Sequence, residues 1–182
     1  MERYKSGYIL LDRDGTVIEE KNYLRDPAGV ALLPGAVEGM RLLRDAGFGL
    51  VLITNQSGIG RGYFTLEDLD RVHERLRELL IEVGISLDGI YICPHAPEQE
   101  CECRKPKPKL ALDAARDLGF DLTRSWMIGD KAADVGLARN CGAGAVLVRT
   151  GYGAEAEAEG VKPEIFADNL LDAAQQIKAT LQ

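Results

Sequence analysis

Residues 93–109, CPHAPEQECECRKPKPK, concentrate the side chain types that most readily bind a metal ion. Three of the four cysteines and one of the two histidines of the chain lie within the first eleven of these residues. Their spacing is a CxH pair, five intervening residues and a CxC pair. Three thiolates and one imidazole match a tetrahedral Zn²⁺ site of the Cys₃His type. The four predicted ligands are Cys93, His95, Cys101 and Cys103.

Such a zinc site would be structural, because four protein ligands leave no coordination position open for a substrate. Residues 93–103 are too polar to fold around a core of their own, so the metal would hold this segment and orient Arg104 and Lys105, which follow it. A disulfide is one alternative, and a reducing compartment disfavours it. Ordinary packing is another, and it would not explain two prolines and so many polar neighbours.

A second group of residues could bind Mg²⁺ and phosphate. The segment LDRDGT (11–16) places two carboxylates, Asp12 and Asp14, before a glycine that permits a tight turn. On their own they could merely cap that turn. The segment TNQSG (54–58) adds a hydroxyl and an amide from Thr54 and Asn55, Lys105 adds a fixed cation, and GD (129–130) adds a further carboxylate. The combination predicts a Mg²⁺ site beside a phosphate cradle, with a carboxylate available as nucleophile.

The elements that must position these residues are short apolar strands that alternate with amphipathic helices. The strand segments are apolar at both odd and even positions, which is typical of strands buried on both faces of a parallel sheet. We predict strands at 8–11, 49–54, 89–93, 125–129 and 145–148, and helices at about 36–46, 66–83, 108–118, 132–140 and 170–181. Thr65 and Asp68 should cap the second helix. The segment GAEAEAEG (153–160) is predicted to be a solvated loop.

Strict alternation of strand and helix predicts one doubly wound α/β domain over residues 1–182, with the zinc-binding loop inserted after the third strand. The chain between Asp14 and the second strand is too short for a separate cap domain. Loops at 17–25 and 55–64, together with the zinc loop, should therefore roof the crevice. Four ligand-type residues stand at the strand ends, and three of them should meet at the carboxyl edge. These four are Asp12, Thr54, Cys93 and Asp130.

Composition excludes several classes of protein. The chain has 46% hydrophobic and 28% charged residues, as expected of a globular protein, and a formal net charge of −7 that disfavours nucleic-acid binding. No apolar run approaches the ~20 residues that span a bilayer. Charged residues interrupt the N-terminal apolar run, so no signal peptide is expected and a cytoplasmic location follows. We expect a monomer that acts on a small molecule.

The segments LDRDGT, TNQSG, RKP and GDK, in this order, resemble the four motifs of the haloacid dehalogenase (HAD) superfamily of phosphatases. The resemblance covers nearly the whole chain. It implies that Asp12 is the nucleophile that becomes an aspartyl-phosphate and that Asp14 is the acid/base. Thr54 and Lys105 would hold the transferred phosphoryl. Mg²⁺ would be bound by Asp12, the Asp14 carbonyl and Asp130.

The cysteine loop narrows the resemblance. DRDGT, TNQSGIGRG, CPHxP…CxCRKP, GDK and LVRTGYG together resemble the D-glycero-D-manno-heptose 1,7-bisphosphate 7-phosphatases of bacterial heptose biosynthesis, which supplies the lipopolysaccharide core. Histidinol-phosphate phosphatases share the Cys/His loop and are the alternative. Polynucleotide 3′-phosphatases share a TNQxGIxRG run but do not typically carry the zinc loop. An inactive, zinc-stabilised interaction module is a fourth possibility, although every catalytic motif is present.

Several residues have competing interpretations. GIGRG (58–62) lacks the last glycine of a dinucleotide-binding GxGxxG, so a loop that bends around substrate is favoured. Arg104 could meet a second anionic group or sugar hydroxyls. Lys131 could contact phosphate or the Mg²⁺ carboxylates, or could pair with Asp134 or another acid on the following helix. His73 is interpreted as a surface or packing residue, and Cys141 as a small buried residue.

Overall fold

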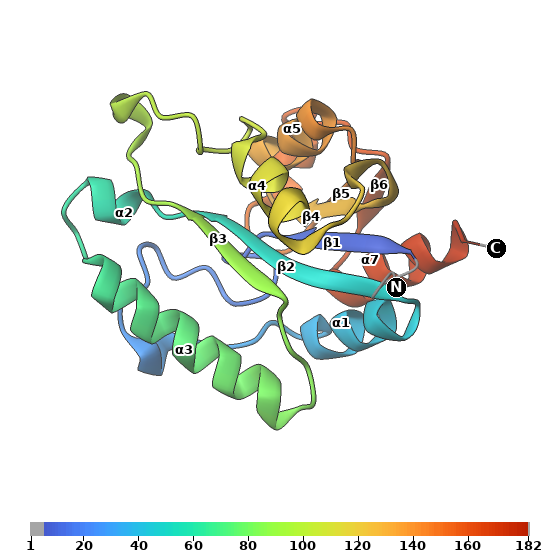
Figure 1. Cartoon of the computed structure of the whole chain (residues 1–182), viewed down its shortest axis with the longest axis horizontal. Helices are drawn as coiled ribbons and strands as arrows, with labels where there is room; N and C mark the ends of the chain where they lie inside the picture. The colour runs from blue at the N-terminus through green and yellow to red at the C-terminus, as the bar shows by residue number, and fades with distance from the viewer. Residues whose placement is uncertain (1–5, 182) are drawn as a thin grey trace.

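A computed structural model describes residues 6–181, so predictions that concern residues 1–5 and 182 lie outside the described part of the chain. The fold is built on one six-stranded parallel sheet with the strand order β3-β2-β1-β4-β5-β6 (Figure 1). The strands are β1 (Gly7–Leu11), β2 (Phe48–Asn55), β3 (Gly89–Cys93), β4 (Trp126–Gly129), β5 (Gly144–Val148) and β6 (Ile165–Ala167). This order confirms the predicted doubly wound α/β class.

Helices cover both faces of the sheet. They are α1 (Ala36–Asp45), α2 (Ser57–Gly60), α3 (Leu66–Glu82), α4 (Lys109–Leu118), α5 (Ala132–Cys141), α6 (Gly153–Ala158) and α7 (Leu170–Ala179), with 3₁₀ turns at Pro27–Gly29, Pro97–Gln99 and Leu122–Arg124. In Figure 1, α4 and α5 lie above the sheet, and α1, α3 and α7 lie below it. All helices within residues 6–181 belong to this sheet and its edge loops, without a separate cap domain.

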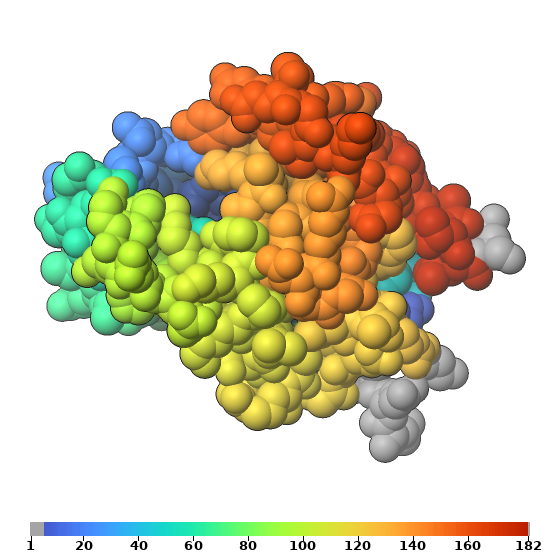
Figure 2. Space-filling model, turned by 90° about the horizontal axis from the view of Figure 1, so that it is seen from above, coloured from blue at the N-terminus to red at the C-terminus, as the bar shows by residue number. Residues whose placement is uncertain are grey.

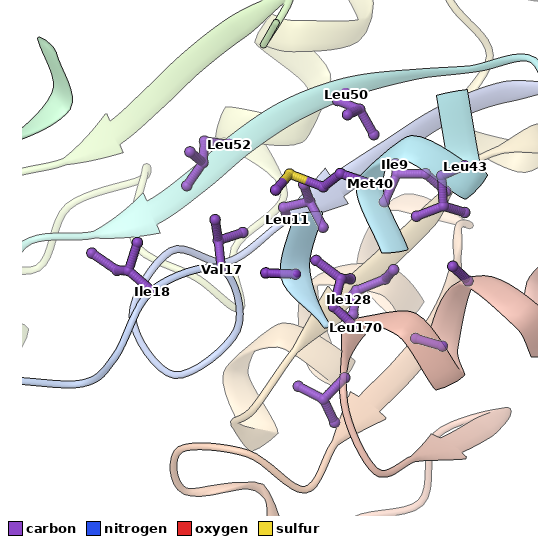
Figure 3. Packing of buried hydrophobic residues seen from close by; sticks show 14 of the residues in the cluster. Ile9, Leu11, Val17, Ile18, Met40, Leu43, Leu50, Leu52, Ile128 and Leu170 are labelled. Carbon is purple, nitrogen blue, oxygen red and sulfur yellow. The ribbon is translucent and has the colours of Figure 1, made fainter. Parts of the chain in front are cut away.

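Two hydrophobic clusters pack against the two faces, because neighbouring strand residues point to opposite sides. Ile9 and Leu11 join the cluster formed with α1, α3 and α7, whereas Tyr8 and Leu10 join the cluster formed with α4, α5 and α6. Figure 3 shows Met40 of α1 among the strand side chains of the first cluster. Burial on both faces of the sheet thus explains why the strands are apolar at both odd and even positions.

The boundaries of α3 follow from local chemistry. The Thr65 side chain accepts a hydrogen bond from the Asp68 N–H, and the Asp68 carboxylate accepts one from the Thr65 N–H. This reciprocal capping box satisfies two of the free N–H groups at the start of the helix, as the sequence predicts. The chain turns at Gly84, whose φ of +75° suits glycine, immediately after the helix.

Two predictions were wrong, and two short elements were not predicted. The segment predicted as a solvated loop at 153–160 contains the helix α6, because Gly153 and Ala156 are buried against β5 and the other residues are alanine and glutamate, which favour helix. The short strand β6 and the one-turn helix α2 were not predicted, since three or four residues carry too little periodicity. Cys141 is only half-buried at the end of α5.

The strand order determines where the functional residues meet. β1 lies between β2 and β4. Successive strands are added on one side of β1 up to β3 and on its other side from β4 to β6, so the strand order reverses between β1 and β4, and a crevice forms there at the carboxyl ends of the parallel strands. Asp12 follows β1, Thr54 is the last residue but one of β2, and Asp130 follows β4. No helix within residues 6–181 is both long and apolar enough to cross a membrane.

Candidate active site

A cavity of about 240 Å³ lies at this carboxyl edge. Three loops line it: residues 20–24, residues 55–58 and the segment that begins with Arg104, together with the start of α5. Figure 2 shows the surface hollowed where the blue N-terminal segment meets the green and orange segments. Two of the three loops that the sequence predicts as a roof, 17–25 and 55–64, therefore contribute to this cavity. The zinc loop at 93–103 contributes none of its lining residues, although Arg104 and Lys105, which follow it, do.

Asp12 and Lys105 form a buried ion pair at the base of the cavity. The Lys105 ammonium donates to Asp12 Oδ1 at 2.9 Å, to Asp134 Oδ1 at 2.7 Å and to the Ile53 carbonyl at 2.8 Å. Only 3% of the Lys105 side chain is exposed. Because the three acceptors occupy all three ammonium hydrogens, the cation is held in one position beside Asp12.

The charges around this pair keep both groups ionised. Burial alone would raise the pKa of Asp12, but Lys105 and Lys131 outweigh it and hold that pKa below its ordinary value. Burial likewise opposes the charge on Lys105, but Asp12 and Asp134 outweigh it and raise the pKa of the ammonium. Asp12 is therefore a carboxylate, the form that acts as a nucleophile.

Asp130 and Asp134 place two further carboxylates next to Asp12. One oxygen from each of the three lies within 4.8 Å of the others, and all three residues are buried. Asp130 Oδ2 accepts from the Tyr152 N–H at 2.9 Å, whereas Asp130 Oδ1 is buried without a hydrogen-bond partner among the described residues. Both oxygens of Asp134 accept hydrogen bonds, from Lys105 and from the Lys131 N–H. Asp130 Oδ1 is thus the atom left for a cation.

Gly15 and Gly151 allow two loops to close around Asp130. Their φ angles are +79° and +55°, and a Cβ built on either residue would lie 2.2 Å from Asp130 Oδ2. The Thr150 hydroxyl links the loops by donating to the Gly15 carbonyl at 2.7 Å. A side chain at either glycine would therefore displace the Asp130 carboxylate.

This crowding of carboxylates raises two pKa values. Burial, followed by the charge of Asp12, raises the pKa of Asp130 to about 8. The same two causes, in the same order, raise the pKa of Asp134 to about 6. A divalent cation would relieve this repulsion, and Mg²⁺ prefers oxygen ligands of this kind. The donor set therefore fits Mg²⁺.

Asp14 lies in the cavity wall and is held by two side chains. The Arg13 guanidinium donates to both of its oxygens, from Nε at 3.2 and 3.1 Å and from Nη2 at 3.0 Å. The Gln56 amide donates to Asp14 Oδ2 at 3.0 Å, and Gln56 Oε1 accepts from Arg13 Nη2 at 3.2 Å. His73, in the middle of α3, contacts Arg13 from the other side. These contacts fix the orientation of the Asp14 carboxylate.

The side chains of Thr54 and Asn55 both form hydrogen bonds within the protein. Thr54 is buried outside the cavity lining, and its hydroxyl accepts from the Gln56 amide at 2.8 Å. Asn55 lines the cavity, but its side chain accepts from the Lys105 N–H at 3.0 Å and donates to the Lys105 carbonyl at 3.3 Å. Asn55 therefore clamps the backbone that carries Lys105.

Arg104 and Lys131 lie at the rim of the cavity. The Arg104 guanidinium donates to the His95 carbonyl at 3.4 Å, which ties it to the cysteine loop. The Lys131 ammonium pairs with Glu20 at 3.6 Å and lies 5.0 Å from the centre of the Tyr152 ring. Of the alternatives left open for Lys131, a side chain ion pair with Asp134 is not found among the described residues, because only the Lys131 backbone N–H donates to Asp134.

The four predicted zinc ligands converge in one cluster. Cys93 Sγ lies 3.5 Å from Cys101 Sγ and 3.1 Å from Cys103 Sγ, and His95 Nδ1 lies 3.7 and 3.3 Å from the Cys93 and Cys103 sulfurs. A tetrahedral zinc with bonds of about 2.3 Å sets ligand atoms roughly 3.5–3.8 Å apart. The geometry and the donor types fit a zinc ion.

Comparisons with known proteins give the family of the chain. Residues 102–173 match the family model described as HAD-hydrolase-like. The D-glycero-beta-D-manno-heptose-1,7-bisphosphate 7-phosphatase of Yersinia pestis is 42% identical over 180 residues, which covers 94% of this chain and 95% of that protein. The enzyme of the same name from Escherichia coli K12 is 39% identical over 178 residues, with 93% of each covered. The chain belongs to this family of phosphatases.

A solved structure of the family supports the fold. The crystal structure of D,D-heptose 1,7-bisphosphate phosphatase from B. bronchiseptica, complexed with magnesium and phosphate, matches with a TM-score of 0.89 and 34% identity, covering 96% of this chain and 99% of that one. The chain is therefore a phosphatase with the HAD-like fold. The family supports the heptose interpretation over histidinol-phosphate phosphatase.

Four residues of the site were not among the predicted site residues. Asp134 stands four residues after Asp130, near the start of α5, and this short separation could have indicated a second carboxylate beside it. Gln56 lies inside the TNQSG segment and could have been included with it. Arg13 and His73 carried no signal, because the sequence does not show that a charged residue and a helical histidine are buried together.

Proposed function

We propose that this chain is a Mg²⁺-dependent phosphomonoesterase that removes the 7-phosphate of D-glycero-D-manno-heptose 1,7-bisphosphate through an aspartyl-phosphate at Asp12. The observation that carries the proposal is the buried contact of Asp12 with Lys105 at the base of a cavity that also contains Asp14. The substrate follows from the names of the relatives, which match almost the whole chain.

In the first half of the reaction, Asp12 attacks phosphorus and the bond from phosphorus to the C7 oxygen breaks. Asp14 gives its proton to that oxygen as it leaves. In the second half, a water attacks the acyl phosphate while Asp14 takes its proton, which releases inorganic phosphate and restores Asp12. Lys105 stabilises the charge on the transferred group, since its ammonium already lies against Asp12.

Asp12, Asp130 and the Asp14 carbonyl would hold Mg²⁺, and the unpartnered Asp130 Oδ1 supports this assignment. When bound, Mg²⁺ neutralises charge on the phosphoryl group and on the carboxylates. Asp134 positions neighbouring groups of the site, because it accepts hydrogen bonds from the Lys105 ammonium and from the Lys131 backbone N–H.

Zn²⁺ on the cysteine cluster would have a structural role. The cluster precedes Lys105 in sequence, and Arg104 contacts the His95 carbonyl inside it. Zn²⁺ binding would thus hold the loop that presents both basic residues to the cavity. Reduced cysteines require a reducing compartment, so we place the enzyme in the cytoplasm. We propose that the single domain acts as a monomer.

Substrate turnover tests the proposal directly. Phosphate release from heptose 1,7-bisphosphate and from histidinol phosphate should be measured side by side, after EDTA and after the return of Mg²⁺. We expect Mg²⁺-dependent loss of the 7-phosphate alone, with kcat/KM at least about tenfold above that for histidinol phosphate, because Arg104 and Lys131 offer cations to the second phosphate. Preferred cleavage of histidinol phosphate would overturn the substrate assignment, and no turnover would overturn the activity.

A further inference from the structure

Arg13 is the largest side chain among those that the fold buries almost completely, with 1% of its surface exposed. It stands between Asp12 and Asp14 in sequence, and a buried cation needs an acceptor for each of its donors. Its guanidinium finds three side chains: Asp14, Gln56 and His73. Two of these belong to the loops that line the cavity, whereas His73 comes from the helix α3.

His73 is buried, and its Nε2 lies 3.1 Å from Arg13 Nη1. Burial, and then the charges of Arg13 and Arg77, lower the pKa of His73 to about 3. The imidazole is therefore neutral, and Nε2 accepts from the guanidinium, which places the imidazole proton on Nδ1. An apolar residue would fill the same core position without this acceptor.

We propose that His73 is a positioning residue for the acid/base Asp14, on which it acts through Arg13. This inference rests on the proposed function, since Asp14 has a catalytic role only if the chain transfers phosphoryl groups. α3 provides a rigid anchor, because it is capped at Thr65 and packed on the sheet through Val72 and Leu76. His73 transmits this rigidity to the guanidinium, and the guanidinium transmits it to both oxygens of Asp14.

Without the His73 acceptor, Arg13 Nη1 would be a buried donor with no partner there. The guanidinium would then rotate toward another acceptor, and the Asp14 carboxylate would move with it because the two groups share three contacts. A proton donor that is displaced by about 1 Å can lose as much as 10²-fold in rate. Asp12 and Lys105 are held by a separate set of contacts, so they should stay in place.

The leaving group distinguishes positioning of Asp14 from a merely structural effect. An alkyl phosphate such as the 7-phosphate ester needs a proton from Asp14 as its phosphorus–oxygen bond breaks. The p-nitrophenolate of p-nitrophenyl phosphate leaves without one. Because kcat/KM reports only the steps up to release of the alcohol, a displaced Asp14 should lower it for the sugar ester alone. A loss of folded enzyme would lower kcat/KM equally for both substrates.

The variants His73→Phe and His73→Leu remove the acceptor, and His73→Gln restores one. We expect the first two to lower kcat/KM for heptose 1,7-bisphosphate by roughly tenfold and for p-nitrophenyl phosphate by less than about twofold, and His73→Gln to recover most of the loss. Leu80→Ala is the matched control on the same helix, because Leu80 is buried but belongs to the hydrophobic cluster. It should lower Tm without changing the ratio of the two kcat/KM values.

Asp14→Ala separates this inference from the proposed function. Asp14→Ala could lower kcat/KM for the sugar ester selectively while His73→Phe and His73→Leu lower kcat/KM equally for both substrates or for neither. In that case the positioning role is wrong and the proposed function stands. If Asp14→Ala itself shows no selective loss, the acid/base assignment falls, and the inference falls with it. Selective loss in all three variants, with recovery in His73→Gln, supports both.

Discussion

Replacing Lys105 with methionine would remove the cation from between two buried carboxylates while keeping most of the side chain volume. The Lys105 ammonium contacts Asp12 at 2.9 Å and Asp134 at 2.7 Å, and these two side chains are 5% and 2% exposed. Little solvent reaches these two carboxylates to compensate for the lost cation. The change therefore affects both the stability of the fold and the chemistry of Asp12.

The loss of stability can be estimated from the two contacts. Removing one partner of a buried ion pair typically costs about 3–5 kcal/mol, because the remaining charge is left without compensation. The loss of stability in Lys105→Met should be smaller at low pH, because Asp134 then binds a proton and no longer carries an uncompensated charge. Even in the wild type the pKa of Asp134 is raised to about 6, and without Lys105 it should rise further. A carboxyl with a raised pKa stabilises the fold below its unfolded pKa and loses that contribution as pH rises, so the deficit should grow from pH 5 to pH 8.

Catalysis should fall for every phosphate ester. Lys105 stabilises charge that develops on the transferred phosphoryl, and removal of one such donor costs roughly 10²–10³ in kcat. Urea unfolding at pH 5 and pH 8, together with kinetics on heptose 1,7-bisphosphate and p-nitrophenyl phosphate, measures both effects. Lys109→Met is the control, because Lys109 pairs with Asp113 on the exposed surface. If Lys105→Met matched this control in stability, or kept wild-type kcat, the role assigned to Lys105 would be refuted.

Three further predictions address the rim and the metals. Arg104→Ala should lower kcat/KM for heptose 1,7-bisphosphate by a factor that corresponds to about 1.5–3 kcal/mol, because a charged hydrogen bond is lost. The kcat/KM for p-nitrophenyl phosphate should stay nearly unchanged, and equal losses for both substrates would mean that Arg104 serves the chemistry. Metal-free protein should lose stability as pH rises from 4 to 8, because the pKa values of Asp130 and Asp134 are raised to about 8 and about 6. Mg²⁺ should therefore raise Tm more at pH 8 than at pH 5. A rise in Tm that does not depend on pH would contradict this site. Removal of zinc, or Cys101→Ser, should lower both Tm and kcat, and an unchanged melting temperature would exclude a structural zinc.

The sheet could be predicted because the residue pattern of its strands indicates that both of their faces are buried. Residues 49–54 are apolar at both parities, and only burial on both faces explains that pattern. The capping residues and Gly84 marked the limits of α3 for the same reason: each has a local chemical role. β6 has three residues and forms by pairing with β5, a contact that no local pattern shows. α6 has only six residues, too few for an amphipathic pattern, although alanine and glutamate favour helix, and it packs against β5.

The site could be predicted where residue type and strand end coincide. Asp12 and Asp130 follow strands that prove to be neighbours, and the four cysteine-loop ligands lie together. The roles of individual polar contacts could not be predicted, because they depend on side chain direction. Asn55 clamps the Lys105 backbone through both ends of its amide, and Thr54 bonds to Gln56 outside the cavity lining. Burial of Arg13 against His73 is a long-range contact of the same kind.

Formation of a phosphoryl–enzyme at Asp12 tests the central claim most directly. Wild-type protein should be mixed with heptose 1,7-bisphosphate and Mg²⁺, quenched rapidly in acid and mapped by mass spectrometry of its peptides. We predict a base-labile phosphate on Asp12, and an Asp12→Asn variant that keeps its fold but neither forms this adduct nor turns over, because a neutral amide cannot become an acyl phosphate. Phosphate on another residue, or appreciable turnover by Asp12→Asn protein, would contradict the account.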